Sequence, residues 1–175
     1  MTKSLFISIF LSLFSFAAFS QESQIQLTEK ASITFPEKPD VRNMQDIATV
    51  YSLKLADSSA NFFAIIQDLG KNNGLTADQL KSAQTGPDFW LQLESSFVAQ
   101  LGAETQVLTR ERKKIGANEV LILVLSTMRN GNKMEVTSYV FIAGVYSINI
   151  IYNKRSDNAS VDMKNKFFNS LIITL

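Results

Sequence analysis

The sequence predicts an α+β fold, with a mostly antiparallel sheet of about 6–8 strands flanked by helices in a layered α/β/α-type sandwich. Two observations lead to this class. Long runs with strand character are joined by tight turns, which suits antiparallel pairing. Segments with helical periodicity interrupt these runs and follow them, and we expect these helices to cover the faces of the sheet.

Residues 1–20 have the order of parts of a secretory signal peptide and are set apart from the fold. A positive start is followed by an apolar stretch at 5–16 and by small side chains at Ala18 and Ser20. A retained N-terminal anchor is the alternative, although a membrane span needs about 20 apolar residues and this stretch is shorter. We expect residues 21–175 to form one secreted or periplasmic domain, with no transmembrane segment after signal cleavage.

The first half of the mature chain predicts four strands, at residues 24–27, 31–35, 47–55 and 61–68. Pro36 ends the second strand because proline fixes φ and lacks a backbone donor. Alternation over 47–55 places Ile47 and every second residue after it on one buried face. The glycines and asparagines at 70–74 predict a flexible loop.

Two helices are expected in the middle of the chain. Thr76 and Gln79 have the spacing of a capping box that begins a helix over 76–83. Pro87 suits the first position of a second helix over 87–101. Apolar residues recur every four positions in this second helix, at Phe89, Leu93, Phe97 and Leu101.

The second half predicts four more strands, at residues 105–112, 119–128, 133–142 and 145–152. Asn130-Gly131 is a strong hairpin signal between the middle two. Ser160 is a suitable N-cap for a last helix over 161–170. Residues 171–175 are either a final strand or an apolar tail.

Composition excludes several classes of activity. The chain has no His and no Cys, so a Ser-His-Asp triad, a Cys nucleophile and a Cys/His zinc site are impossible within it. Residues 21–175 hold 16 basic and 16 acidic side chains, because Lys3 is the only charged residue before them. This neutral balance gives no reason to expect nucleic acid as a partner. Because no glycine motif for nucleotides appears and the acids are scattered at turns and helix starts, we expect no cofactor, no metal site and no catalytic residue.

Two groups of side chains are candidates for a ligand or partner surface: Trp90, Phe89, Arg110, Arg112, Lys113 and Lys114. The aromatic pair has the spacing of a helix face, where such side chains more often belong to the core. The basic run 110–114 also suits the solvated face of an edge strand, where Lys and Arg discourage edge-to-edge pairing. Both interpretations remain open from the sequence.

The segment Ile33-Thr34-Phe35-Pro36-Glu37-Lys38-Pro39, followed by an alternating strand, an Asn-Gly hairpin and a C-terminal helix, resembles the PsbP/Mog1-like superfamily. Small secreted bacterial domains of unknown function within that superfamily look most similar. The resemblance implies a central antiparallel sheet between helices and an accessory, assembly or binding role without catalysis.

Three functions follow in order of preference. The first is a non-enzymatic accessory or binding domain, secreted or periplasmic, whose partner is a protein or envelope component of unknown identity. The second is a small-molecule or lipid carrier with a pocket between the sheet and the 87–101 helix. The third is a carboxylate-based hydrolase, which needs two acids about 5–10 Å apart.

Overall fold

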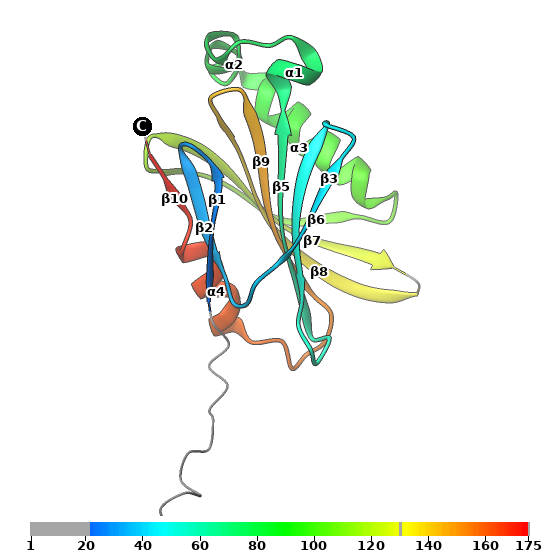
Figure 1. The fold of residues 1–175 in the computed structure, drawn as a ribbon. Helices are drawn as coiled ribbons and strands as arrows, with labels where there is room; N and C mark the ends of the chain where they lie inside the picture. The colour runs from blue at the N-terminus through cyan, green and yellow to red at the C-terminus, as the bar shows by residue number, and fades with distance from the viewer. Residues whose placement is uncertain (1–21, 130, 175) are drawn as a thin grey trace, which may run out of the picture.

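The computed structural model describes residues 22–129 and 131–174, so the predicted signal peptide lies outside the described residues. Its centre is a seven-stranded antiparallel sheet (Figure 1). In spatial order the strands are β3 (Asp40–Met44), β4 (Ala48–Lys54), β5 (Ala60–Asp68), β9 (Tyr146–Lys154), β8 (Asn132–Ala143), β7 (Asn118–Arg129) and β6 (Gln106–Ile115). This sheet confirms the α+β class and the expected number of strands.

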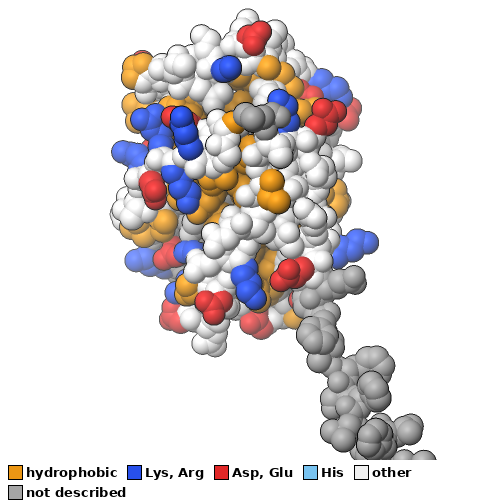
Figure 2. Space-filling model, turned by 90° about the vertical axis from the view of Figure 1, so that its left-hand side faces the viewer, with side chains coloured by type: hydrophobic (Ala, Val, Ile, Leu, Met, Phe, Trp, Pro, Cys, Tyr) orange, Lys and Arg blue, Asp and Glu red, His pale blue; other side chains and the backbone are white. Residues whose placement is uncertain are grey.

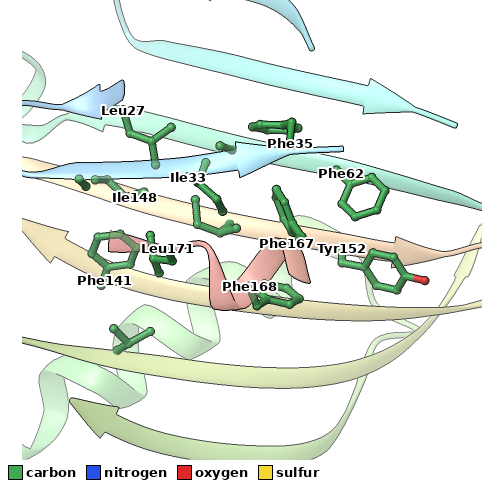
Figure 3. Close-up of a cluster of buried hydrophobic side chains, with 14 of the residues drawn as sticks. Leu27, Ile33, Phe35, Phe62, Phe141, Ile148, Tyr152, Phe167, Phe168 and Leu171 are labelled. Carbon is green, nitrogen blue, oxygen red and sulfur yellow. The ribbon is translucent and has the colours of Figure 1, made fainter. Parts of the chain in front are cut away.

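One face of the central sheet is covered by a mixed layer. It consists of a small sheet, β1 (Ser23–Thr28), β2 (Ala31–Phe35) and β10 (Ile172–Ile173), together with helix α4 (Val161–Asn169). Phe167 of α4 lies between the two sheets, with edge-to-face ring contacts to Phe35 at 5.1 Å and to Phe62 at 4.9 Å (Figure 3). These three rings are fully buried, so they supply a large apolar contribution to stability.

The other face is covered by helix α3 (Pro87–Leu101), with the short helices α1 (Leu69–Asn73) and α2 (Ala77–Ala83) preceding it (Figure 1). Trp90 and Phe97 of α3 pack against Leu123 and Leu125 of β7, which point to this face. The expectation that helices alone cover both faces is therefore incomplete, because three short strands share one outer layer with α4.

Two segments differ from the sequence prediction. β3 was not expected from the sequence. All five of its residues are exposed, and an edge strand with solvent on both faces does not alternate between apolar and polar residues. Residues 70–74 were predicted as a loop, but α1 occupies most of them. Its backbone is held at both ends: the Asp68 carboxylate accepts from the Lys71 amide at 2.9 Å, and Gly74 ends the turn at φ 67°.

Other local predictions are confirmed. α3 spans the predicted 87–101, and the Thr76–Gln79 capping box begins α2. Residues 171–175 contain strand β10, which pairs with β2 through Ile173 and Ala31.

Ile47 was predicted to be buried but is exposed, since it lies in the turn before β4 and not in the strand. Among the residues described, no helix combines the length and the apolar character needed to cross a bilayer.

Candidate functional site

The basic run 110–114 lies on β6, which is the outermost strand of the central sheet. Every residue from Leu108 to Lys114 is exposed. Register with β7 assigns the side chains to faces, because directly opposite residues point to the same side. Arg110 is opposite Leu123 and Arg112 is opposite Leu121, so both arginines project on the α3 side. Lys113 is opposite Val120 and therefore projects on the α4 side.

An ion pair joins α3 to this edge. The Glu94 side chain points toward the sheet and is only 8% exposed, and the Arg110 guanidinium donates to its Oε1. The hydrogen bond from Arg110 to Glu94, together with the negative charge of Glu94, raises the pKa of Arg110 above its ordinary value. Because a buried carboxylate is costly unless it is paired, this bridge fixes the α3 position relative to β6.

Trp90 lies one helical turn before Glu94 on the same buried face of α3. Its indole Nε1 donates to the Gln84 carbonyl at 3.1 Å, and the Arg112 guanidinium lies 6.0 Å from the ring centroid. Phe89 contacts the Trp90 ring edge-to-face at 5.1 Å. Hydrogen bond and ring contacts hold the indole in one orientation, so Arg112 has a rigid aromatic support.

A shallow cleft of about 250 Å³ runs along this junction. Its walls come from Trp90 and Glu94 on one side and from Arg110 and Arg112 on the other, and Leu91 forms its rim with 57% of its surface exposed. We call these five residues the α3–β6 surface. It combines exposed Leu91 and two guanidinium groups above the nearly buried Trp90 ring and Glu94 carboxylate, and apolar and Arg side chains are common at protein-binding surfaces.

The six predicted surface residues do not form one patch. Trp90, Arg110 and Arg112 come together, and Phe89 supports the Trp90 ring from the helix. Lys114 lines a separate groove of about 570 Å³ with Lys30 and Lys81. Lys113 belongs to the opposite face, described next.

On the α4 side of β6, Lys113 lies over the ring of Tyr139 with its Nζ 5.5 Å from the centroid. The other face of that ring stacks on Phe168 at 4.1 Å. Burial, and next the charge of Glu111, raise the pKa of Tyr139 above its ordinary value. Figure 2 shows hydrophobic side chains between groups of Lys and Arg on the side of the molecule where β10 lies.

Glu94 and Leu91 are the members of the site that sequence reasoning missed. A signal for Glu94 existed: it occupies the apolar stripe of α3 between Trp90 and Phe97, where a charge is unexpected. Its partner was not deducible, because the pair joins residues whose contact depends on where α3 crosses the sheet. Leu91 carries no signal, since single exposed leucines are ordinary.

The space between α3 and the sheet is filled. Leu123 and Leu125 beneath the helix are fully buried, and Trp90 and Phe97 above them are nearly so. The cleft at the rim of the helix is smaller than the 300–1,000 Å³ usual for a small-molecule site. This packing disfavours a carrier with its pocket under the 87–101 helix.

Four acids of the described chain lie at turns or helix starts. Asp57 accepts from the Ser59 amide at 2.9 Å and Asp68 caps α1, while Asp78 and Asp88 lie in the first turns of helices. No group of three or more acidic side chains that could hold a metal ion occurs within residues 22–129 and 131–174.

Comparisons with known proteins agree on architecture. Cyanobacterial PsbP from Synechocystis sp. PCC 6803 superposes with a TM-score of 0.58 at 11% identity, over 88% of this chain and 93% of that one. The chain has a PsbP-like fold. LpqN of Mycobacterium tuberculosis, described as involved in cell envelope biogenesis, gives a TM-score of 0.51 at 15% identity, over 89% of this chain and 91% of LpqN.

A third structure, from Bacteroides thetaiotaomicron VPI-5482, is matched over 82% of this chain at 11% identity with a TM-score of 0.45. The chain spans only 44% of that longer protein. No family model and no curated protein matches the sequence. At 11% and 15% identity, the matches to PsbP and LpqN show the fold and not the activity.

Proposed function

We propose that this protein is a secreted or periplasmic, non-enzymatic accessory domain that binds a protein or envelope component through the α3–β6 surface. The observation that carries the proposal is the cleft at this junction, where exposed Leu91 adjoins Arg110 and Arg112. The two arginines are held from beneath by Glu94 and Trp90. A surface whose side chains are fixed before binding loses less entropy when a partner docks.

The envelope location is supported by sequence and by one neighbour. The signal-like segment 1–20 directs the chain across a membrane, and the absence of Cys is compatible with an oxidising compartment. LpqN, which shares the fold, is described as involved in cell envelope biogenesis.

A binding role is also favoured by chemistry. The chain has no His or Cys, so its general acid–base groups are carboxylates, Lys and Tyr. Asp57 accepts a backbone hydrogen bond in a turn, and Asp68 caps helix α1. Side chains of the α3–β6 surface have the properties of contact residues: Leu91 is exposed, and the Arg112 guanidinium, which has only a long, half-solvated pair with Glu119, can bind a carboxylate in two-pronged fashion.

Photo-crosslinking in the native envelope tests the proposal. A photoreactive amino acid replaces Leu91 at the α3–β6 surface or, as a matched control, Val161, an exposed apolar residue at the start of α4. We expect a discrete adduct from position 91 that disappears when Arg112→Glu is added, and none from position 161. Equal adducts from the two positions, or none from position 91, would contradict the proposal.

A further inference from the structure

β6 ends the central sheet with an open backbone edge. The strand order places β7 on one side of β6, and no other strand of the described chain pairs with its second side. Seven consecutive residues of this strand, Leu108 to Lys114, are exposed. An edge strand of this length presents a row of backbone donors and acceptors that can pair with an added strand.

The charge on this edge is one-sided. Arg110 is already paired with Glu94, which leaves Arg112, Lys113 and Lys114 against the single acid Glu111 within the strand. The nearest carboxylate to Arg112 belongs to Glu119 on β7, at 3.9 Å with both side chains about half exposed. Such a long, solvated pair is weak, so Arg112 can exchange it for a new partner.

The opposite edge of the same sheet differs. β3 has five exposed residues, and its one acid, Asp40, is balanced by its one base, Arg42. Both edges are exposed, but only β6 carries a surplus of positive charge. Charge therefore distinguishes the two edges for any approaching strand.

We propose that β6 pairs with an extended acidic segment of the partner, which adds an eighth strand to the central sheet. This inference rests on the proposed function and specifies the class of partner. Arg112 and Lys114 point to the same side of the sheet, because residues two apart share a face. The added strand is expected to carry carboxylates at every second position, where directly opposite side chains come within about 5 Å.

A neighbouring apolar contact completes the surface. Leu91 lies on α3 beside Arg110 and Arg112, at the rim of the same cleft. The acidic side chains of the added strand face Arg110 and Arg112. An apolar side chain on that same side of the added strand therefore reaches Leu91. Main-chain hydrogen bonds supply affinity in strand addition, and side chains on alternate positions supply specificity.

Basic residues on an edge also discourage pairing with like-charged strands. Antiparallel pairing with a second copy of β6 centred on Arg112 would place Arg110 opposite Lys114 and Arg112 opposite itself on the α3 side, and Glu111 opposite Lys113 on the other side. The same charges that oppose this pairing attract a strand of the opposite sign. The positive charges on the α3 side of β6 therefore favour an acidic strand and disfavour pairing between two copies of this chain.

Trp90, the single Trp of the chain, allows binding to be measured without a label, because Arg112 lies over its ring. Three ten-residue peptides are titrated into the protein: alternating Glu and Thr, alternating Lys and Thr, and a peptide with the same Glu and Thr content in two blocks. We expect the alternating acidic peptide to change the Trp90 emission and to bind at least about tenfold more tightly than either of the others. Equal affinity for the acidic and basic peptides would overturn the proposal.

Backbone pairing is tested with two N-methylated forms of the acidic peptide, each methylated on one alternate set of amides. Only one set points at β6, so one form should lose binding and the other retain it. Full retention by both forms would show that the acid binds without forming a strand, and would overturn the proposal.

Variants then locate the site. Arg112→Glu with Lys114→Glu should weaken the acidic peptide about tenfold or more, whereas Lys38→Glu with Arg42→Glu near the β3 edge makes the same charge change and should have no effect. Equal weakening by the two variants would show that the peptide responds to the overall charge of the protein and not to β6, and would overturn the proposal. If crosslinks from position 91 persist while no peptide binds, the strand inference fails and the proposed function stands. A dimer in sedimentation that the β6 variant abolishes would instead assign the edge to a second copy of this chain.

Discussion

Gly116 lies where the β6–β7 turn passes against the C-terminal strand β10. Its φ is +59°, and a Cβ built on it would overlap the carbonyl oxygen of Ile173 and come within 3.2 Å of the carbonyl carbon. Gly144, in the β8–β9 turn, has nearly the same φ of +62°, but its Cβ would meet nothing within 4 Å. Alanine at these two positions therefore separates the cost of backbone conformation from the cost of contact.

We expect Gly144→Ala to destabilise the protein by about 1–2 kcal/mol, the usual cost of a left-handed conformation for a residue with a Cβ. Gly116→Ala has the same conformational cost, and its Cβ in addition pushes β10 away from the β6–β7 turn. Ile173 is 6% exposed and its strand pairs with β2 at only two positions. Loss of its burial adds about 1.5–3 kcal/mol, so we expect about 3–5 kcal/mol in total.

Urea and thermal unfolding of residues 21–175, followed by far-UV circular dichroism, measure both variants. The excess cost of Gly116→Ala over Gly144→Ala corresponds to a Tm difference of roughly 4–10 °C for a domain of this size. Equal destabilisation by the two substitutions would refute the reasoning, because it would mean that β10 does not pack against the turn.

Three further outcomes are expected. Arg110→Met should destabilise the protein by leaving Glu94 buried and unpaired, and urea unfolding should show that Glu94→Met added to it restores stability; a double variant weaker than the single one would contradict this. Gln45, at φ 45° in the β3–β4 turn, is strained, and Gln45→Gly should raise the free energy of unfolding by about 0.5 kcal/mol, measured from the urea midpoint, whereas a loss would argue against strain. Burial raises the pKa of Tyr139 and of Tyr152 above the ordinary value of 10.0. The stability that each protonated tyrosine contributes is therefore fully present below pH 10 and is lost as pH rises through its pKa in the folded state. Tyr139→Phe should therefore lose less stability between pH 9 and 11 than the parent, and identical pH profiles would contradict it.

Elements with a strong local signal were predictable from sequence. α3 combines a proline at its first position with apolar residues every four, and its predicted bounds are those of the structure. β3 lacked any such signal: its residues Asp40–Met44 are held by pairing with β4, and a strand exposed on both faces has no buried side to create a pattern. α1 is similar, because one turn of helix depends on caps and neighbours more than on its own propensity.

The candidate site was predictable only in its parts. The basic run suggested an edge strand, and Trp90 suggested a helix face, but their meeting depends on where α3 crosses the sheet. The order of strands pairs β5 with β9, so residues distant in sequence become neighbours and β6 is left at the edge beside β7. A single sequence shows the residue types and the periodicity of the apolar positions. The place where α3 crosses the sheet depends on how large side chains such as Trp90 and Phe97 pack against Leu123.

Both faces of the inner strands of the central sheet are covered, which limits where this domain can meet a partner. One face is covered by α4 and the small sheet and the other by α3, with side chains such as Phe167 and Leu123 fully buried. Binding on either face would require a covering layer to move away, at the cost of several large apolar contacts. An edge needs no such movement. Of the two edges, β3 is short and balanced in charge, whereas β6 is longer, positively charged and braced from α3 by Glu94 and Trp90. A rigid, charged edge next to an exposed leucine is therefore the part of this fold best suited to select a partner.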